Sequence, residues 1–233
     1  MKFNKKNHLV VLQARCSSKR FPNKVLMKIN NFPLVVLSAK RLANQGSKVV
    51  VATSTDTSDD KLIKILKKYK IDYFRGSLKN VLSRYQFIAK SLKNSDIMIR
   101  ATSDNALPDG ILIKKILKKF KQVKKSYWYI NKKDHNFPKG LSLEIFTVKK
   151  ILSLKKNLTK SDKEHVTKAI YKSKKKYYRL IDNKIKLEKN FSDLNVSIDT
   201  KKDLKFVRSI FKKIQNPLKI SYKNLLKIAI NLK

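Results

Sequence analysis

Short apolar runs alternate with helical patterns over the first half of the chain. Four runs, rich in β-branched side chains and bounded by polar turns, predict buried strands at 8–13, 48–53, 71–74 and 96–100. Helical patterns separate these runs. The order favours an α/β fold of the Rossmann-like class, with a doubly wound, mostly parallel sheet and helices on both faces. Ligands of such sheets bind beyond the carboxyl ends of the strands.

Two segments carry apolar residues at the i, i+3, i+4, i+7 spacing of an amphipathic helix. They are residues 62–69, with Leu62, Ile65, Leu66 and Tyr69, and residues 113–120, with Ile113, Ile116, Leu117 and Phe120. Thr57 and Ser58 precede the first segment as candidate N-caps. Looser patterns predict helices near 34–45 and 79–92.

The second half is less regular. Strands are predicted near 126–130, 142–146, 177–181 and 194–198, and a helix from about Ser161. Asn216-Pro217 separates the last two helical stretches. Neither a repeat nor a low-complexity linker divides the sequence. We therefore expect one domain over residues 1–233, with a small mixed β extension on the parallel sheet.

The charge balance is unusual, with 57 basic and 16 acidic residues and a formal net charge of +41. Such a surface attracts polyanions, including nucleic acids, anionic membranes and nucleoside triphosphates. The lysines, however, fall as scattered doublets on the polar faces of the predicted helices, and no nucleic-acid-binding motif accompanies them. We expect no dedicated nucleic-acid partner, and we keep a non-catalytic polyanion-binding protein as an alternative.

Cysteine usage and hydropathy bear on the compartment. Cys16 is the single cysteine, so the chain forms no internal disulfide. The apolar run at residues 9–12 is shorter than the core of a signal peptide, and no stretch approaches the roughly 20 apolar residues of a membrane span. We expect a cytoplasmic protein without a membrane partner.

The segment after the first predicted strand, residues 13–24, carries candidate chemistry. Arg15, Arg20 and Lys24 lie there with the hydroxyl of Ser18. Cations, hydroxyls and backbone N–H groups at a strand end suit a phosphate group. The segment matches neither GxxxxGK[ST] nor GxGxxG, which excludes the P-loop and dinucleotide-binding classes. A solvated basic turn is the alternative interpretation.

A series of motifs in fixed order resembles one known family. They are QARCSSKRFPNK (13–24), VVATSTDTSDD (50–60), RGS (75–77), VLSRY (81–85), RATSDN (100–105), PKGLSLE (138–144), EHVT (164–167) and VSIDT (196–200). Together they resemble the cytidylyltransferases of the spore-coat-polysaccharide type, kin to the acylneuraminate and 3-deoxy-manno-octulosonate enzymes. Ser17, Asn23 and Ser103 stand where that family usually has glycine.

The resemblance implies a fold of the nucleotide-diphospho-sugar transferase type and a reaction that joins CMP from CTP to a sugar, with release of pyrophosphate. It implies a sugar acid as acceptor, a role in surface polysaccharide or glycan synthesis, Mg²⁺ as cofactor, and a homodimer formed through residues 125–146. A glycosyltransferase or another nucleotidyltransferase of the same fold is the alternative.

The resemblance also implies roles for single residues. Arg15, Lys24 and Asp104 correspond to catalytic positions, and Asp104 and Asp199 to metal ligands at the ends of two predicted strands. The implied substrate-binding residues are Ala14, Ser18, Arg20, Arg75, Arg84, Arg100, Glu144 and His165. We expect Asp104 and Asp199 to meet at one Mg²⁺ and to repel each other without it. Cys16 has no histidine near it in the sequence and is expected to be a packed residue.

Overall fold

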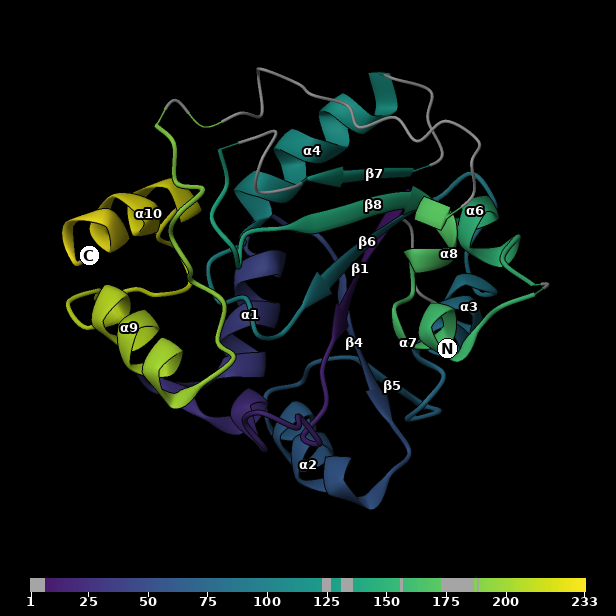
Figure 1. The fold of residues 1–233 in the computed structure, drawn as a ribbon, viewed down its shortest axis with the longest axis horizontal. Helices are drawn as coiled ribbons and strands as arrows, with labels where there is room; N and C mark the ends of the chain where they lie inside the picture. Colours follow the sequence, from purple (N-terminus) through teal and green to yellow (C-terminus); the bar gives the residue numbers. More distant parts are fainter. Residues whose placement is uncertain (1–6, 123–126, 131–135, 156, 173–186, 188) are drawn as a thin grey trace.

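The computed structural model describes residues 7–122, 127–130, 136–155, 157–172, 187 and 189–233. Its main feature is a six-stranded sheet in the order β5-β4-β1-β6-β8-β7 (Figure 1). The strands are β1 (His8–Gln13), β4 (Val49–Ser54), β5 (Tyr73–Gly76), β6 (Ile97–Thr102), β7 (Tyr127–Ile130) and β8 (Leu143–Thr147). Only β8 runs antiparallel to its neighbours β6 and β7. The predicted mostly parallel sheet with a mixed extension is confirmed.

Helices cover both faces of this sheet (Figure 1). On one side lie α1 (Leu34–Ala43), α2 (Asp60–Lys68), α4 (Gly110–Gln122), α9 (Lys201–Phe211) and α10 (Tyr222–Asn231), and on the other α3 (Val81–Ala89), α6 (Val148–Leu152), α7 (Lys160–Glu164) and α8 (Lys168–Lys172). A sheet buried on both faces needs apolar residues at successive positions, which explains the continuous apolar runs in the sequence.

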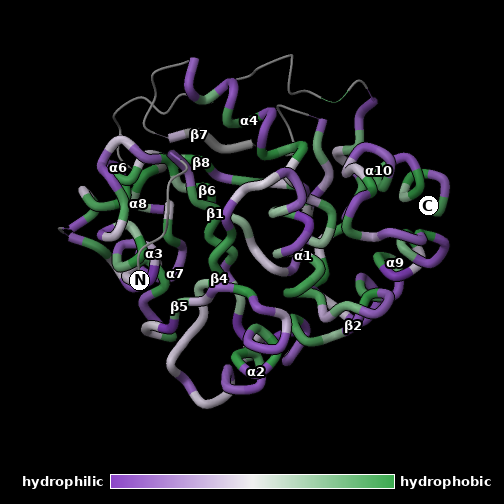
Figure 2. Tube along the Cα trace, turned by 180° about the vertical axis from the view of Figure 1, so that it is seen from behind, coloured by the Kyte–Doolittle hydropathy of each residue, from purple (hydrophilic) through white to green (hydrophobic). Residues whose placement is uncertain are grey.

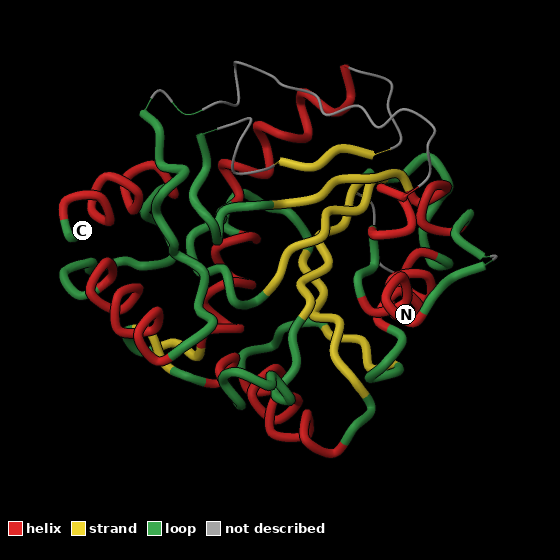
Figure 3. The backbone as a smooth tube through the Cα atoms, in the orientation of Figure 1, coloured by secondary structure: helices red, strands yellow, loops and turns green. Residues whose placement is uncertain are grey.

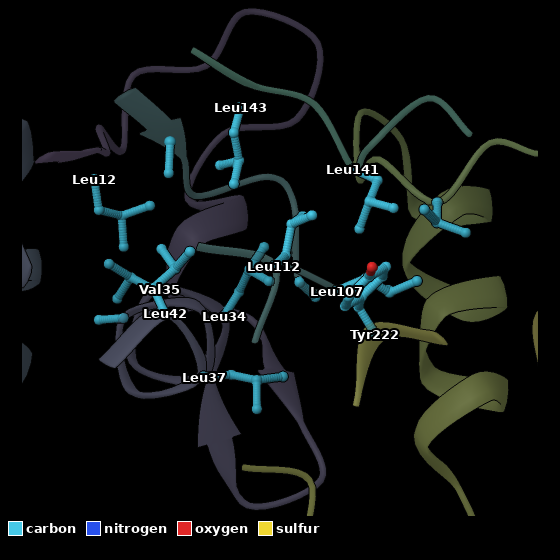
Figure 4. Close-up of a cluster of buried hydrophobic side chains, with 14 of the residues drawn as sticks. Leu12, Leu34, Val35, Leu37, Leu42, Leu107, Leu112, Leu141, Leu143 and Tyr222 are labelled. Carbon is cyan, nitrogen blue, oxygen red and sulfur yellow. The ribbon is translucent and has the colours of Figure 1, made fainter. Parts of the chain in front are cut away.

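The strand β1 shows how the two cores are divided. Val10 and Leu12 belong to the core on the α1 side, whereas Leu9 and Val11 belong to the core on the α3 side. Successive strand residues point to opposite faces, so one strand serves both cores. Figure 2 shows the central strands as mostly hydrophobic, while the surrounding helices alternate between hydrophobic and hydrophilic residues. Figure 4 shows side chains of α1 packing toward those of α4 and the start of α10.

Most predicted elements agree with the structure within a few residues (Figure 3). The 71–74 strand is shifted to Tyr73–Gly76, and α2 is preceded by a 3₁₀ turn, Thr57–Asp59, whose N-cap is Asp56 rather than Thr57 or Ser58. The predicted strand 177–181 lies outside the described residues. No helix in the described ranges combines the length and apolar character needed to span a bilayer.

The predicted strand at 194–198 is wrong. Its residues form an extended segment with two isolated bridges, Asn105 with Ser197 and Lys139 with Asn195. The segment therefore pairs with two different neighbours and joins no sheet. Its β-branched residues Val196 and Ile198 are nevertheless fully buried, which explains why the pattern indicated a strand.

Candidate active site

A cavity of about 440 Å³ opens at the carboxyl ends of β1 and β6. Its lining comes from four parts of the chain: Gln13, Ala14, Arg15, Ser18, Lys19, Arg20, Lys24, Val25, Thr102, Ser103, Asp104, Glu164, His165 and Asp199. This is the sheet edge at which parallel α/β folds bind ligands. Predicted site residues Ala14, Arg15, Ser18, Arg20 and Lys24 therefore lie together here, as do Asp104, His165 and Asp199.

The basic loop after β1 is closed by its own backbone. The carbonyl of Cys16 accepts hydrogen bonds from the N–H groups of Ser18 and Asn23, at 2.9 and 2.8 Å. Asn23 has a left-handed φ of 57°, a conformation that asparagine reaches more easily than most residues. Ser17 and Ser103, the other residues at usual glycine positions, do not have positive φ. The turn therefore forms without those glycines.

Asp59 anchors this loop to the end of β4. Its fully buried carboxylate accepts hydrogen bonds from the Cys16 N–H at 2.7 Å, from Thr53 Oγ1 at 2.9 Å and from the Ser54 N–H at 3.1 Å. Asp59 is not among the site residues that the sequence predicted. The hydroxyl residues around it in STDTSDD were the available signal for a buried carboxylate.

Burial and the nearby Asp59 raise the pKa of the Cys16 thiol to about 12. A thiol with this pKa stays protonated at neutral pH, and only the thiolate is a strong nucleophile. The expected packing role of Cys16 agrees with its burial in the core.

Lys24 joins the two predicted metal ligands. Its ammonium nitrogen lies 3.2 Å from Asp104 Oδ2, 3.2 Å from Asp199 Oδ1 and 2.8 Å from the carbonyl oxygen of Ile198. The two carboxylate oxygens are therefore separated by no more than twice 3.2 Å. Lys24 is only 8% exposed, so its ammonium group forms hydrogen bonds with protein oxygens in place of water.

Backbone pairing brings the two aspartates together. The Ile198 N–H donates to the Asp104 carbonyl at 2.9 Å, next to the isolated bridge between Asn105 and Ser197. After Asp199, Thr200 and Asp203 form a capping box at the start of α9. Asp203 also accepts a hydrogen bond from the Asp199 N–H at 3.0 Å. These contacts fix Asp199 at the mouth of the cavity.

Asp199 is surrounded by positive charge. Besides Lys24, the Arg20 guanidinium lies 3.0 Å from Oδ1 and the Lys139 ammonium 2.9 Å from Oδ2. Burial by itself would raise the pKa of Asp199, but hydrogen bonds from Lys139 and Lys24 outweigh burial and lower it. The expected repulsion between two bare carboxylates is therefore wrong, because Lys24 lies between them. Lys139 was absent from our sequence-based set of site residues.

The donor set suits a hard divalent cation. Such a cation commonly binds through one or two carboxylates and completes its coordination with water and substrate phosphate oxygens. The ammonium of Lys24 already lies between two carboxylates and is a stand-in for a cation at this point. Among the described residues, no group of three or more His, Cys, Asp or Glu side chains is arranged to hold a metal ion. Asp104 and Asp199 thus fit a metal shared with a nucleotide rather than one held by protein alone.

The end of α7 also contributes to the lining of the cavity, through Glu164 and His165. Arg15 forms an ion pair with Glu164 at 3.5 Å, and both side chains are partly exposed. His165 is the C-cap of α7. Arg15 and His165 therefore line the same cavity as Asp199.

Two predicted substrate-binding arginines do not line the cavity. Arg75 donates to the carbonyls of Ser54 and Asp56 and to the carboxylate of Asp60, which fixes the loop between β4 and α2. Arg84 is 1% exposed and donates to backbone carbonyls, including those of residues 77 and 78. Their guanidinium groups donate to backbone oxygens, and neither residue is part of the cavity lining.

Arg100 and Glu144 do not line the cavity either, and they form an ion pair in which Glu144 is buried and Arg100 is partly exposed. Glu144 also accepts hydrogen bonds from the hydroxyls of Tyr127 at 2.9 Å and Thr167 at 2.6 Å. Arg100 donates to Oε1 of Gln13 at 3.2 Å, and Gln13 lines the cavity. The ion pair therefore contacts a residue of the cavity lining, Gln13, without lining the cavity itself.

Gly140 allows the 136–141 segment to pack directly on the strand-like segment before Asp199. Its φ is +100°, and a Cβ there would lie 2.5 Å from Ser197 N and 2.6 Å from Val196 C. We expect Gly140→Ala to lower the free energy of unfolding by about 2–3 kcal/mol. The added Cβ would collide with backbone atoms, which cannot move aside as easily as the end of a side chain. Thermal unfolding would measure this.

Gly76→Ala is the matched control for Gly140→Ala. The nearest atoms to a Cβ at Gly76 belong to the side chains of Phe74 and Arg84, at 3.0 and 3.1 Å, and its φ is not positive. Those side chains can shift by a few tenths of an ångström. Equal losses of stability in the two variants would contradict the close backbone approach at Gly140.

Comparison with known proteins identifies the family of this chain. The family model described as cytidylyltransferase matches residues 9–229. The spore coat polysaccharide biosynthesis protein SpsF of Bacillus subtilis is 27% identical over 213 residues, which cover 88% of this chain and 86% of SpsF. The 3-deoxy-manno-octulosonate cytidylyltransferase of Nitratiruptor sp. is 32% identical over 112 residues, 46% of this chain and 45% of that enzyme.

Solved structures show the same fold. The structure of a cytidylyltransferase from Leptospira borgpetersenii superposes with a TM-score of 0.85 at 23% identity, covering 98% of this chain and 95% of that one. The family match extends over nearly the whole chain and includes every residue that lines the cavity. The protein belongs to the cytidylyltransferase family.

Proposed function

We propose that the protein transfers the cytidylyl group of CTP to a hydroxyl of a sugar acid and releases pyrophosphate. The observation that carries the proposal is the contact of Lys24 with both Asp104 and Asp199, inside a cavity bordered by the basic loop. A reaction on a triphosphate needs fixed cations for the phosphoryl oxygens and carboxylates for a metal. This site presents both within a few ångströms.

In the proposed reaction, a sugar hydroxyl oxygen forms a bond to the α-phosphorus. The bond from the α-phosphorus to the bridging oxygen breaks, the electron pair leaves with pyrophosphate, and the hydroxyl proton passes to water. Arg15, Arg20 and Lys24, which all line the cavity, bind the phosphates. Their fixed positions stabilise the charge that develops on the phosphoryl oxygens.

Asp104 and Asp199 are the proposed ligands of Mg²⁺, which when bound with the nucleotide supplies Lewis-acid stabilisation of phosphate charge. Asp59 has a positioning role, because it holds the Cys16 N–H and so the start of the basic loop. The Arg100–Glu144 pair has a similar role toward Gln13. We therefore assign Arg75, Arg84, Arg100 and Glu144 to support of the site.

A sugar acid as acceptor is supported by two observations. The relative from Nitratiruptor is named as a cytidylyltransferase of 3-deoxy-manno-octulosonate, which is a sugar acid. Arg15 and Lys19 also line the cavity, and neither is among the cations that contact Asp199, so their charge would attract a carboxylate. The similarity to SpsF supports a role in surface polysaccharide synthesis.

The family match over residues 9–229 supports treating residues 1–233 as one domain.

The test is a pyrophosphate-release assay that compares CTP, UTP, ATP and GTP, with Mg²⁺, against a panel of sugar acids and neutral sugars. We expect release with CTP and at least one sugar acid. Lys118→Met, on the exposed face of α4, is the control and is expected to keep full activity. Transfer of a sugar from a nucleotide sugar would favour the glycosyltransferase alternative. Salt-sensitive binding of all four nucleotides without turnover would favour a polyanion-binding protein.

A further inference from the structure

We propose that Lys139 is a further nucleotide-binding residue, and that its contact with Asp199 makes metal binding depend on the nucleotide. The proposal rests on the proposed function, since it assigns a role at the same site. Its starting point is the ion pair between the Lys139 ammonium and Asp199 Oδ2, at 2.9 Å.

The backbone of Lys139 is fixed against the segment that leads to Asp199. Its N–H donates to the Leu194 carbonyl at 3.0 Å, and its carbonyl accepts from the Val196 N–H at 2.8 Å. Gly140 permits this close approach. The side chain of Lys139, in contrast, is 53% exposed, whereas that of Asp199 is 9% exposed. The ammonium can therefore change partner while the backbone stays in place.

The two oxygens of Asp199 have different partners. Oδ1 accepts from Lys24 and Arg20, and Lys139 lies at Oδ2. Lys24 also bonds to Asp104 and to a backbone carbonyl, and its side chain is 10% exposed, so it is the most firmly held of the three cations. A metal that reaches Oδ2 must displace Lys139.

The balance of charge at the site then couples the binding of the divalent cation to the binding of the nucleotide. Three cations, Lys24, Arg20 and Lys139, already face the carboxylates of Asp104 and Asp199. A divalent cation alone would add positive charge within a few ångströms of these groups, where like charges repel strongly. The triphosphate is negatively charged, so it can bind the ammonium of Lys139 after the metal displaces it from Asp199. By linkage, the metal then strengthens nucleotide binding by the same factor.

The experiment measures Mn²⁺ binding by electron paramagnetic resonance, with and without CTP, in the full-length protein. We expect wild-type protein to bind Mn²⁺ at least about tenfold more tightly with CTP than without it. Lys139→Met keeps most of the length of the side chain and removes its charge. We expect this variant to bind Mn²⁺ alone about tenfold more tightly, and to bind CTP in the presence of Mn²⁺ about tenfold more weakly.

These opposite changes separate the proposed role from loss of structure, which would weaken both ligands. Lys118→Met is the matched control and should change neither affinity, and Lys139→Arg should restore both toward wild type. A Lys139→Met protein whose two affinities stay unchanged, or fall together, would overturn the role of Lys139. A wild-type protein that binds no CTP would instead overturn the proposed function.

Discussion

The Asp199→Asn protein is expected to lose pyrophosphate release by about 10³-fold and to unfold more easily than wild type. The substitution removes a carboxylate that holds Lys24, Arg20 and Lys139 in the ligand-free protein. It also removes one of the two proposed metal ligands, a loss on the scale of a preorganised charge-stabilising group. Pyrophosphate release and chemical denaturation would measure the two effects.

The expected stability loss is about 1–3 kcal/mol, because a neutral amide leaves cationic donors without their charged acceptor. It depends on pH in a defined direction. The pKa of Asp199 is lowered in the folded protein, so its stabilising effect is present above the unfolded pKa of about 3.9 and is lost as the pH falls further. The difference between wild type and Asp199→Asn should shrink below about pH 4.

Asp203→Asn is a useful comparison, because Asp203 holds the backbone of Asp199 and contacts none of the cations of the site in the contacts described here. It should lower stability through the cap of α9 while retaining most of the activity. An Asp199→Asn protein with full activity would refute the assignment of this carboxylate.

The Lys24→Met protein is expected to release pyrophosphate about 10²-fold more slowly and to show an inverted pH dependence of stability. Without the ammonium, Asp104 and Asp199 face each other within twice 3.2 Å, and like charges this close raise the pKa of the pair. When the pKa of a carboxyl group is higher in the folded protein than in the unfolded chain, the folded protein becomes more stable as the pH falls. The variant should therefore gain stability relative to wild type as the pH falls.

A divalent cation offers a second measurement on this variant. Because Mg²⁺ can take the place of the missing ammonium, it should raise the melting temperature of Lys24→Met more than that of wild type. The double variant Lys24→Met/Asp104→Asn leaves a single carboxylate and should lose both effects. If the double variant keeps the inverted pH dependence, the two carboxylates do not interact as described.

The sequence determined the architecture because its signals are local. The β-branched runs of β1, β4 and β6 and the stripes of α2 and α4 are set by residues within a few positions of one another. The capping box of Thr200 and Asp203 is local in the same way, because its two residues are three positions apart. Placement of Asp104 and the basic loop at one sheet edge followed from the parallel topology.

Only the tertiary structure decided which partner each charged side chain has. Lys24 and Asp199 are 175 residues apart in sequence, and Lys139 and Asp199 are 60 apart. The sequence offered 57 basic residues for 16 acidic ones, so composition alone could not select these pairs.

Long-range packing also separated residues that look alike in the sequence. Arg20 and Arg84 are both arginines of family motifs, yet Arg20 lines the cavity and Arg84 is buried against backbone carbonyls. A buried guanidinium must find oxygen acceptors where water is excluded, and the position of those acceptors is fixed by the folded backbone. The chain sequence therefore specifies the sheet edge and its candidate residues, and the folded chain selects which of them face the ligand.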